Sequence, residues 1–159
     1  MDWPIMPRSC RFHNSWLLAA VLLLPSCQSK SPSGDFNSLV RKGDYAAAIA
    51  LVEKAELAAS EKDGVIGILI LDGLVDPSAA TRPPFVLADG FTRIERAATA
   101  GRTQSIADLR GKFTTGVNYE GKNILMQPNE ALAKCWTTVE AGNDKASTCI
   151  TMRQSLQVP

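Results

Sequence analysis

The residues of this chain that could take part in catalysis, by type and spacing, are acidic. Asp72 and Asp76 lie near a proline-rich segment that predicts a loop. Asp89 and Glu95 fall on one predicted helix, and either pair could supply the acid and the base of glycoside hydrolysis. Acids on solvated helix faces explain the same residues more simply, because ionised carboxylates are rarely buried. The sequence has no phosphate-binding loop, CxxC pair, HExxH motif or nucleophile elbow, so we expect no catalytic residue, no metal and no cofactor.

Cys27 ends a segment that is typical of protein export. A run of nine apolar residues, 16–24, follows Arg8 and Arg11. A membrane span needs about 20 apolar residues, so this run is too short, but it has the length of the apolar part of a secretory signal. The Leu-Pro-Ser-Cys sequence at 24–27 resembles the lipobox of bacterial lipoproteins, in which the chain is cut before the cysteine and the thiol receives lipid. Its proline departs from the usual small residue; cleavage further along or an uncleaved anchor are the alternatives.

The resemblance divides the chain into a signal peptide at 1–26, a lipidated N-terminus and tether at 27–35, and a domain at 36–159. Residues 28–35 are polar and rich in serine, which is typical of a flexible tether. Cleavage would leave one small domain in which basic and acidic side chains are equally numerous. That balance makes nucleic acid an unexpected partner. His13, the only histidine, would leave with the signal, which removes histidine-dependent nucleophilic, zinc and acid–base chemistry.

Two cysteines remain for pairing, Cys135 and Cys149. Cys10 leaves with the signal and Cys27 would carry lipid, so in an oxidising exported compartment the even remainder predicts one disulfide. If Gly142 marks a turn between antiparallel helices, the two cysteines lie level across it, each about two helical turns from the bend. Two reduced, buried thiols are the alternative.

The elements that must position these residues are predicted to be helices from Phe36 onward. Asp44 can cap one helix, and Gly101 and Gly116 can end two others. The segment 64–75 is almost continuously apolar; alone it could be a buried strand, but its context favours a buried helix. In chain order the expected helices span 45–60, 64–75, 85–100, 104–115 and 128–142, with a last one from 144, and loops are expected at 76–84 and 117–127.

The predicted helices repeat in pairs. Segments 94–101 and 135–142 both end in Ala-Gly, which marks corresponding helix ends in two successive pairs. A further pair, at about 45–60 and 63–74, precedes them by a similar interval. Helix pairs that recur with a period of roughly 20 to 50 residues are typical of an α-solenoid, in which each pair buries its apolar face against its neighbours. We therefore predict an all-α fold, a short α-solenoid of about three antiparallel helix hairpins.

Residues 85–156 resemble Sel1-like repeats, which are relatives of the tetratricopeptide repeat. Arg110 and Thr151 stand where the family has glycine, and Gln154 replaces its aromatic residue. The resemblance implies helix pairs stacked into a concave surface that binds another protein. The matching positions are Glu130-Ala131-Leu132, Ala141-Gly142 and Lys145-Ala146 in one pair, and Ala97-Ala98, Gly101, Leu109, Phe113 and Gly116 in the other.

The long loop at 117–127 is the candidate binding segment, because long loops in compact domains are often functional. The alternative is that its apolar run, 124–126, packs back onto the helices. Trp136 and Phe113 are predicted to pack between helices. The candidate binding residues are Tyr119, Glu120, Lys122, Ile124, Leu125 and Met126.

These observations predict a non-catalytic protein-binding module, held by lipid in a bacterial envelope and facing the periplasm. Small lipoproteins with Sel1-like repeats resemble envelope adaptors and also immunity proteins that neutralise secreted effector toxins. We expect an immunity protein, with an envelope scaffold as one alternative. A carboxylate-dependent enzyme acting on cell-wall glycans, through Asp72, Asp89 or Glu120, is the other. Gln28 is not the aspartate that retains lipoproteins at the inner membrane, so we expect the outer membrane.

Overall fold

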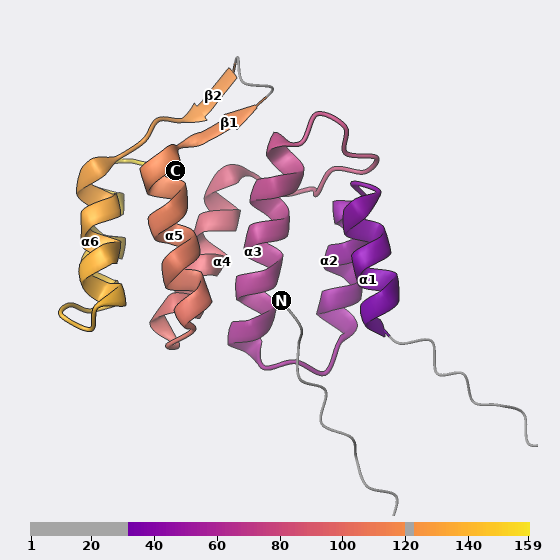
Figure 1. Cartoon of the computed structure of the whole chain (residues 1–159), viewed down its shortest axis with the longest axis horizontal. Coiled ribbons are helices and arrows are strands. Elements are labelled where there is room, and N and C mark those ends of the chain that lie inside the picture. The colour runs from indigo at the N-terminus through magenta and orange to yellow at the C-terminus, as the bar shows by residue number, and fades with distance from the viewer. Residues whose placement is uncertain (1–31, 120–122) are drawn as a thin grey trace, which may run out of the picture.

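The computed structural model describes residues 32–119 and 123–159, and within them the chain is mostly helical, as predicted (Figure 1). The predicted signal peptide, the lipobox, Cys27, Glu120 and Lys122 lie outside the described residues. None of the helices in the described ranges combines the length and apolarity of a membrane span. The elements are α1 (Pro32–Arg41), α2 (Tyr45–Lys54), α3 (Ala59–Val75), α4 (Leu87–Thr99), α5 (Thr103–Thr115), β1 (Val117–Tyr119), β2 (Asn123–Met126), α6 (Glu130–Glu140) and α7 (Ala146–Ser155).

Three helix reversals use the same glycine turn, at Gly43, Gly101 and Gly142. Their φ values are +71°, +87° and +75°, a region that glycine adopts without steric cost. Each glycine N–H donates to the carbonyl three residues earlier, and the next N–H to the carbonyl five earlier, at 2.9–3.0 Å. This Schellman geometry closes α1, α4 and α6 and turns the chain into α2, α5 and α7. The first turn lies between α1 and α2, whereas the sequence predicts the first reversal between residues 60 and 63.

The N-terminal helices differ from the expected ones at their ends. α1 begins at Pro32, so four residues of the predicted tether are helical. The predicted helix 45–60 is wrong at its end, because α2 stops at Lys54 and Ala55 is extended. α3 then starts at Ala59, five residues earlier than predicted, and Glu61 accepts a hydrogen bond from the N–H of Ala58 at 3.3 Å.

The predicted loop at 117–127 is wrong, because it contains an antiparallel hairpin. β1 and β2 pair with Val117 opposite Met126 and Asn118 opposite Ile124. Both side chains of the first pair are buried in the main core, which holds the hairpin against the helices.

The helices lie side by side in chain order from α1 to α6 in Figure 1, with the hairpin at one corner. α3 packs against α4 at Gly67 and Gly90, where a Cβ on Gly67 would lie 2.8 Å from the carbonyl oxygen of Gly90. The backbones therefore touch. α4 contacts α5 and α7, and α6 contacts the same two helices, so these four helices close a ring. In an open solenoid each helix pair contacts the next along the stack, and the return of α7 to α4 is an additional contact.

The core has two hydrophobic clusters that meet at α3. The smaller one joins α2 to α3, and the larger one fills the ring of α4 to α7. Phe113 and Trp136 are fully buried in the larger cluster, which confirms their predicted packing. Phe113 also stacks on Phe91 with 5.2 Å between ring centroids.

The α6–α7 hairpin carries a disulfide between Cys135 and Cys149, whose Cα atoms lie 5.7 Å apart. Both residues are buried, with Cys149 fully inaccessible. The Schellman turn at Gly142 places them level across the hairpin, so the bond ties α7 to α6 from within the core.

Candidate binding surface

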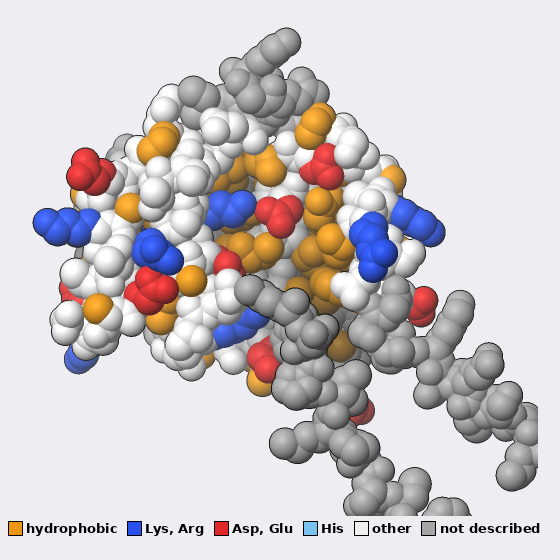
Figure 2. Space-filling model, in the orientation of Figure 1, with side chains coloured by type: hydrophobic (Ala, Val, Ile, Leu, Met, Phe, Trp, Pro, Cys, Tyr) orange, Lys and Arg blue, Asp and Glu red, His pale blue; other side chains and the backbone are white. Residues whose placement is uncertain are grey.

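Figure 2 shows a hollow over α3, bordered by α5 on one side and by α1 and α2 on the other. Hydrophobic side chains lie on its floor, with one acidic and one basic side chain between them. The part between α3 and α5, here called the α3–α5 groove, has a volume of about 300 Å³. Its lining residues are Ile68 of α3 and Ala107, Asp108, Gly111, Lys112 and Thr115 of α5.

An ion pair bridges the α3–α5 groove. Lys112 Nζ lies 3.2 Å from Asp72 Oδ1, and the two side chains are 25% and 42% exposed. Asp72 follows Ile68 by one helical turn, so both fall on the same face of α3. Exposed ion pairs contribute about 0–1 kcal/mol to folding stability. Asp72 and Lys112 can therefore separate and pair with charges of a bound partner at little cost in free energy.

Gly111 leaves a gap in the wall that α5 forms. It is exposed, and a Cβ at this position would meet no atom within 4 Å. Glycine inside a helix costs about 1 kcal/mol relative to alanine, so its place here is not explained by helix stability. The gap widens the groove where it passes Lys112.

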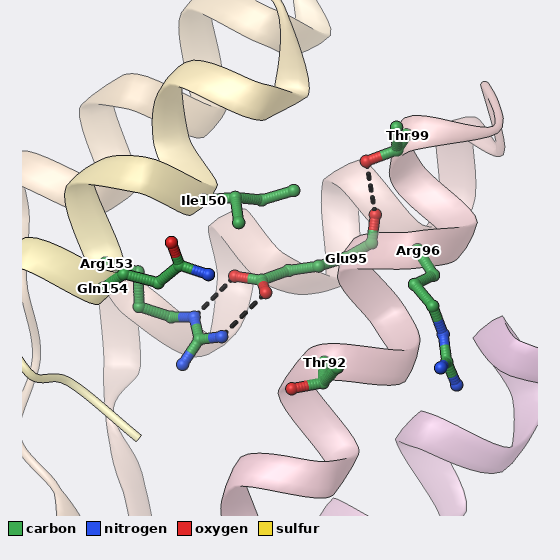
Figure 3. Close-up of a pocket in the computed structure, with 7 residues that line it drawn as sticks. All are labelled: Thr92, Glu95, Arg96, Thr99, Ile150, Arg153 and Gln154. Carbon is green, nitrogen blue, oxygen red and sulfur yellow. Dashed lines mark hydrogen bonds and ion pairs between the residues drawn. The ribbon is translucent and has the colours of Figure 1, made fainter.

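A second depression, between α4 and α7, has a volume of about 270 Å³. Its floor is a two-pronged ion pair: Arg153 Nε and Nη2 donate to the two oxygens of Glu95 at 2.5 and 2.8 Å (Figure 3). Glu95 is only 3% exposed and Arg153 7%, and Arg153 Nη1 also donates to the carbonyl of Val158 at 3.0 Å. Arg96 points away and donates to Asp63 of α3. The charges of this floor are paired with each other, and the ion pair holds α7 against α4.

Glu95 corrects the expectation that the acids lie on solvated faces. Phe91 and Ala98, four residues before it and three after, are buried core residues, so Glu95 falls on the buried stripe of α4. That spacing is the sequence signal which could have revealed it. Its partner Arg153 lies 58 residues away and carries no signal of its own.

Two further acids named as catalytic candidates, Asp89 and Asp76, have structural roles. Asp89 Oδ2 accepts the N–H of Val86 at 3.0 Å and so caps the start of α4. Asp76 Oδ1 accepts the N–H and the hydroxyl of Ser78 at 2.8 and 2.7 Å, which orders the turn after α3. Asp76 Oδ2 accepts the hydroxyl of Tyr45 at 3.3 Å.

No family model, curated protein or solved structure matches this chain. The α3–α5 groove combines the apolar side chains of Ile68 and Ala107, a gap at Gly111 and an exchangeable ion pair, whereas the α4–α7 depression has its charges satisfied. The groove is the better candidate for binding.

Four of the residues that the sequence proposed for binding lie in the two strands: Tyr119, Ile124, Leu125 and Met126. Leu125 is 40% exposed, whereas Met126 is 5% exposed and belongs to the core, so this end of the apolar run packs against the helices. Tyr119 lies in β1 and Ile124 in β2. Between the two side chains of this set whose exposure is described, Leu125 is the one that a partner could reach.

Asp76 gives the structure a dependence on acid. The hydrogen bonds from Ser78, and then that from Tyr45, lower the pKa of Asp76 below its usual 3.8. Because the folded pKa lies below the unfolded one, this contribution to stability is present above the unfolded pKa and is lost as the pH falls through the folded pKa. Asp76→Asn should therefore lose stability at neutral pH and depend less on pH below about 4. Urea unfolding at a series of pH values measures this, and an unchanged acid dependence in the variant would contradict it.

Proposed function

We propose that the chain is a lipid-anchored protein-binding module of a bacterial envelope that faces the periplasm, and that its α3–α5 groove receives a segment of a partner protein. The observation that carries the proposal is the groove itself, with the apolar side chains of Ile68 and Ala107 in its lining and its half-exposed Asp72–Lys112 pair. A partner segment with an apolar side chain between two opposite charges would suit both features, because it would cover Ile68 and re-pair both ions.

Immunity is the specific function that we propose. An immunity protein of this kind would hold an incoming effector toxin at the membrane and cover its working surface. A concave face formed by stacked helices suits that task, because it offers a large complementary area on rigid elements. The anchor in this proposal is lipid on Cys27, and Gln28 after it favours sorting to the outer membrane.

We also propose that the helix pairs are copies of one Sel1-like unit stacked as a short solenoid. The identical turns at Gly101 and Gly142 support this, since they close α4 and α6 in the same way and each is followed by the second helix of its pair. Gly43 closes α1 with the same geometry, which supports α1–α2 as the N-terminal pair in place of the one predicted at 45–60 and 63–74.

Filling the gap at Gly111 is expected to block binding. Gly111→Phe puts an aromatic ring at the α3–α5 groove, where nothing lies within 4 Å of the new Cβ. A partner seated in the groove would meet that ring and should bind about tenfold or more weakly. In cells, deleting the gene should sensitise them to a neighbouring toxin-secreting strain, and Gly111→Phe should fail to restore resistance.

Two variants on the same helix serve as controls. Gly111→Ala adds only a methyl group and should restore resistance while raising helix stability by about 1 kcal/mol. Thr114→Phe places the same ring on an exposed position that does not line the groove, and should also restore resistance. Full resistance in the deletion strain overturns the immunity function, and equal behaviour of Gly111→Phe and Thr114→Phe overturns the assignment of the groove.

A further inference from the structure

We infer that the domain stands on a lipid bilayer with the end that carries the start of α1, and that the hairpin corner points away from the membrane. The inference rests on the proposed lipid at Cys27. The interaction surface is called the proximal end here and consists of the start of α1 together with residues 55–58. Its partner is a phospholipid surface.

The first argument is the length of chain between the lipid and the fold. Pro32 begins α1, so five residue steps separate it from Cys27. Whatever path these residues take, they can span at most about 18 Å. The start of α1 must therefore stay within that distance of the lipid-bearing sulfur, close to the bilayer surface.

The second argument is where the other elements lie. The helices alternate in direction, so the 55–58 connection and the turns at Gly101 and Gly142 lie at the same end as the start of α1 (Figure 1). The hairpin lies at the other end of the helices and at the far side of the row. α3 alone has 17 residues, about 25 Å of helix, and neighbouring helices add about 8–10 Å each across the row. The hairpin corner is thus beyond the reach of the link.

The third argument is the distribution of exposed apolar side chains in the described part of the chain. Leu57, 39% exposed, lies in the 55–58 connection, at the proximal end. Val86, Leu125 and Leu156, at 62%, 40% and 50% exposed, precede α4, lie in β2 and follow α7, all at the distal end. One apolar side chain therefore faces the interface beside the anchor, and the other three face the space from which a protein partner arrives.

Charge does not contribute to this contact. The segment from Glu53 to Lys62 carries three acids and two lysines, so it offers no basic cluster for anionic headgroups. The lipid and the short link fix the orientation, and added salt should leave it unchanged.

Site-specific fluorescence quenching on vesicles tests the inference. Leu57→Cys and Val86→Cys are labelled in the full lipidated chain, where Cys135 and Cys149 are bonded to each other. The chain is placed in phosphatidylethanolamine–phosphatidylglycerol vesicles with a quencher on some headgroups. The label at 57 should lose most of its fluorescence and the label at 86 almost none, at low and at high salt. Leu156→Cys is a second distal position and should match Val86→Cys.

A lengthened link is the matched control. Inserting about 20 Gly/Ser residues before Pro32 raises the typical span of the link to about 25 Å and should abolish the difference between the two labels. Equal quenching at 57 and 86 with the natural link means that the domain lies flat and overturns the orientation. The mass of the N-terminal peptide separates the causes of failure: a chain without lipid on Cys27 overturns the anchor and the orientation together, and a lipidated chain with equal quenching overturns the orientation alone.

Discussion

Arg153→Met is expected to lower the free energy of unfolding by about 3–5 kcal/mol, because it leaves Glu95 as an unpaired charge in the core. Glu95 is 3% exposed, and its two oxygens accept hydrogen bonds from Arg153 at 2.5 and 2.8 Å. Burying a carboxylate without its partner costs several kcal/mol. Urea unfolding followed by circular dichroism measures the loss.

A double variant separates the charge from the packing. Glu95→Leu combined with Arg153→Met replaces both charges by apolar groups and should recover most of the loss, because a buried ion pair is often no more stable than a hydrophobic pair. Arg96→Met is the surface control: Arg96 is 58% exposed in its pair with Asp63 and should cost about 0–1 kcal/mol. If Arg153→Met is no more damaging than Arg96→Met, the pair is not functioning as a buried one.

Removing the disulfide is expected to cost about 3 kcal/mol. The bond joins residues 14 apart. In the chain-entropy model, a disulfide that closes a loop of about this size stabilises the folded state by that amount, because it restricts the unfolded chain. The double variant Cys135→Ala with Cys149→Ala should show the full loss by urea unfolding without any reductant. Each alanine also removes a sulfur from the core, which adds to the cost.

Reduction of the natural chain supplies the comparison. A thiol reductant should lower the midpoint of unfolding of the natural chain and leave that of the double-alanine variant unchanged. The difference between the reduced chain and the variant measures the packing of the sulfurs alone. A natural chain whose stability does not respond to full reduction would contradict the role of the bond.

The helices of the C-terminal half were predictable because residues next to their ends, such as glycine, determine where they stop. Gly101 and Gly142 adopt positive φ and stop α4 and α6 where the sequence indicated. α1 was not predicted over Pro32–Asp35, because a polar, serine-rich stretch has no apolar periodicity to indicate it. The hairpin was missed since its strands have three and four residues, too few to show a period of two.

The candidate site was less predictable, because its parts come from distant positions. Lys112 and Asp72 are 40 residues apart, and each alone is an ordinary helical charge. Their contact depends on the side-by-side packing of α3 and α5, which no local pattern encodes. The same holds for Arg153, whose partner is set by the return of α7 to α4.

The disulfide and the ion pair of α7 determine which part of the molecule would unfold first under tension. Cys149 binds α7 to α6, and Arg153, one turn later, binds it to α4. α1 has no such fastening among the described residues and rests on α2 and its cluster through the half-buried Phe36, Leu39 and Val40. A pull between the proposed anchor and a captured partner enters the fold at α1. α1 would unfold first and lengthen the link to the membrane, while the ring of α4 to α7 stays folded.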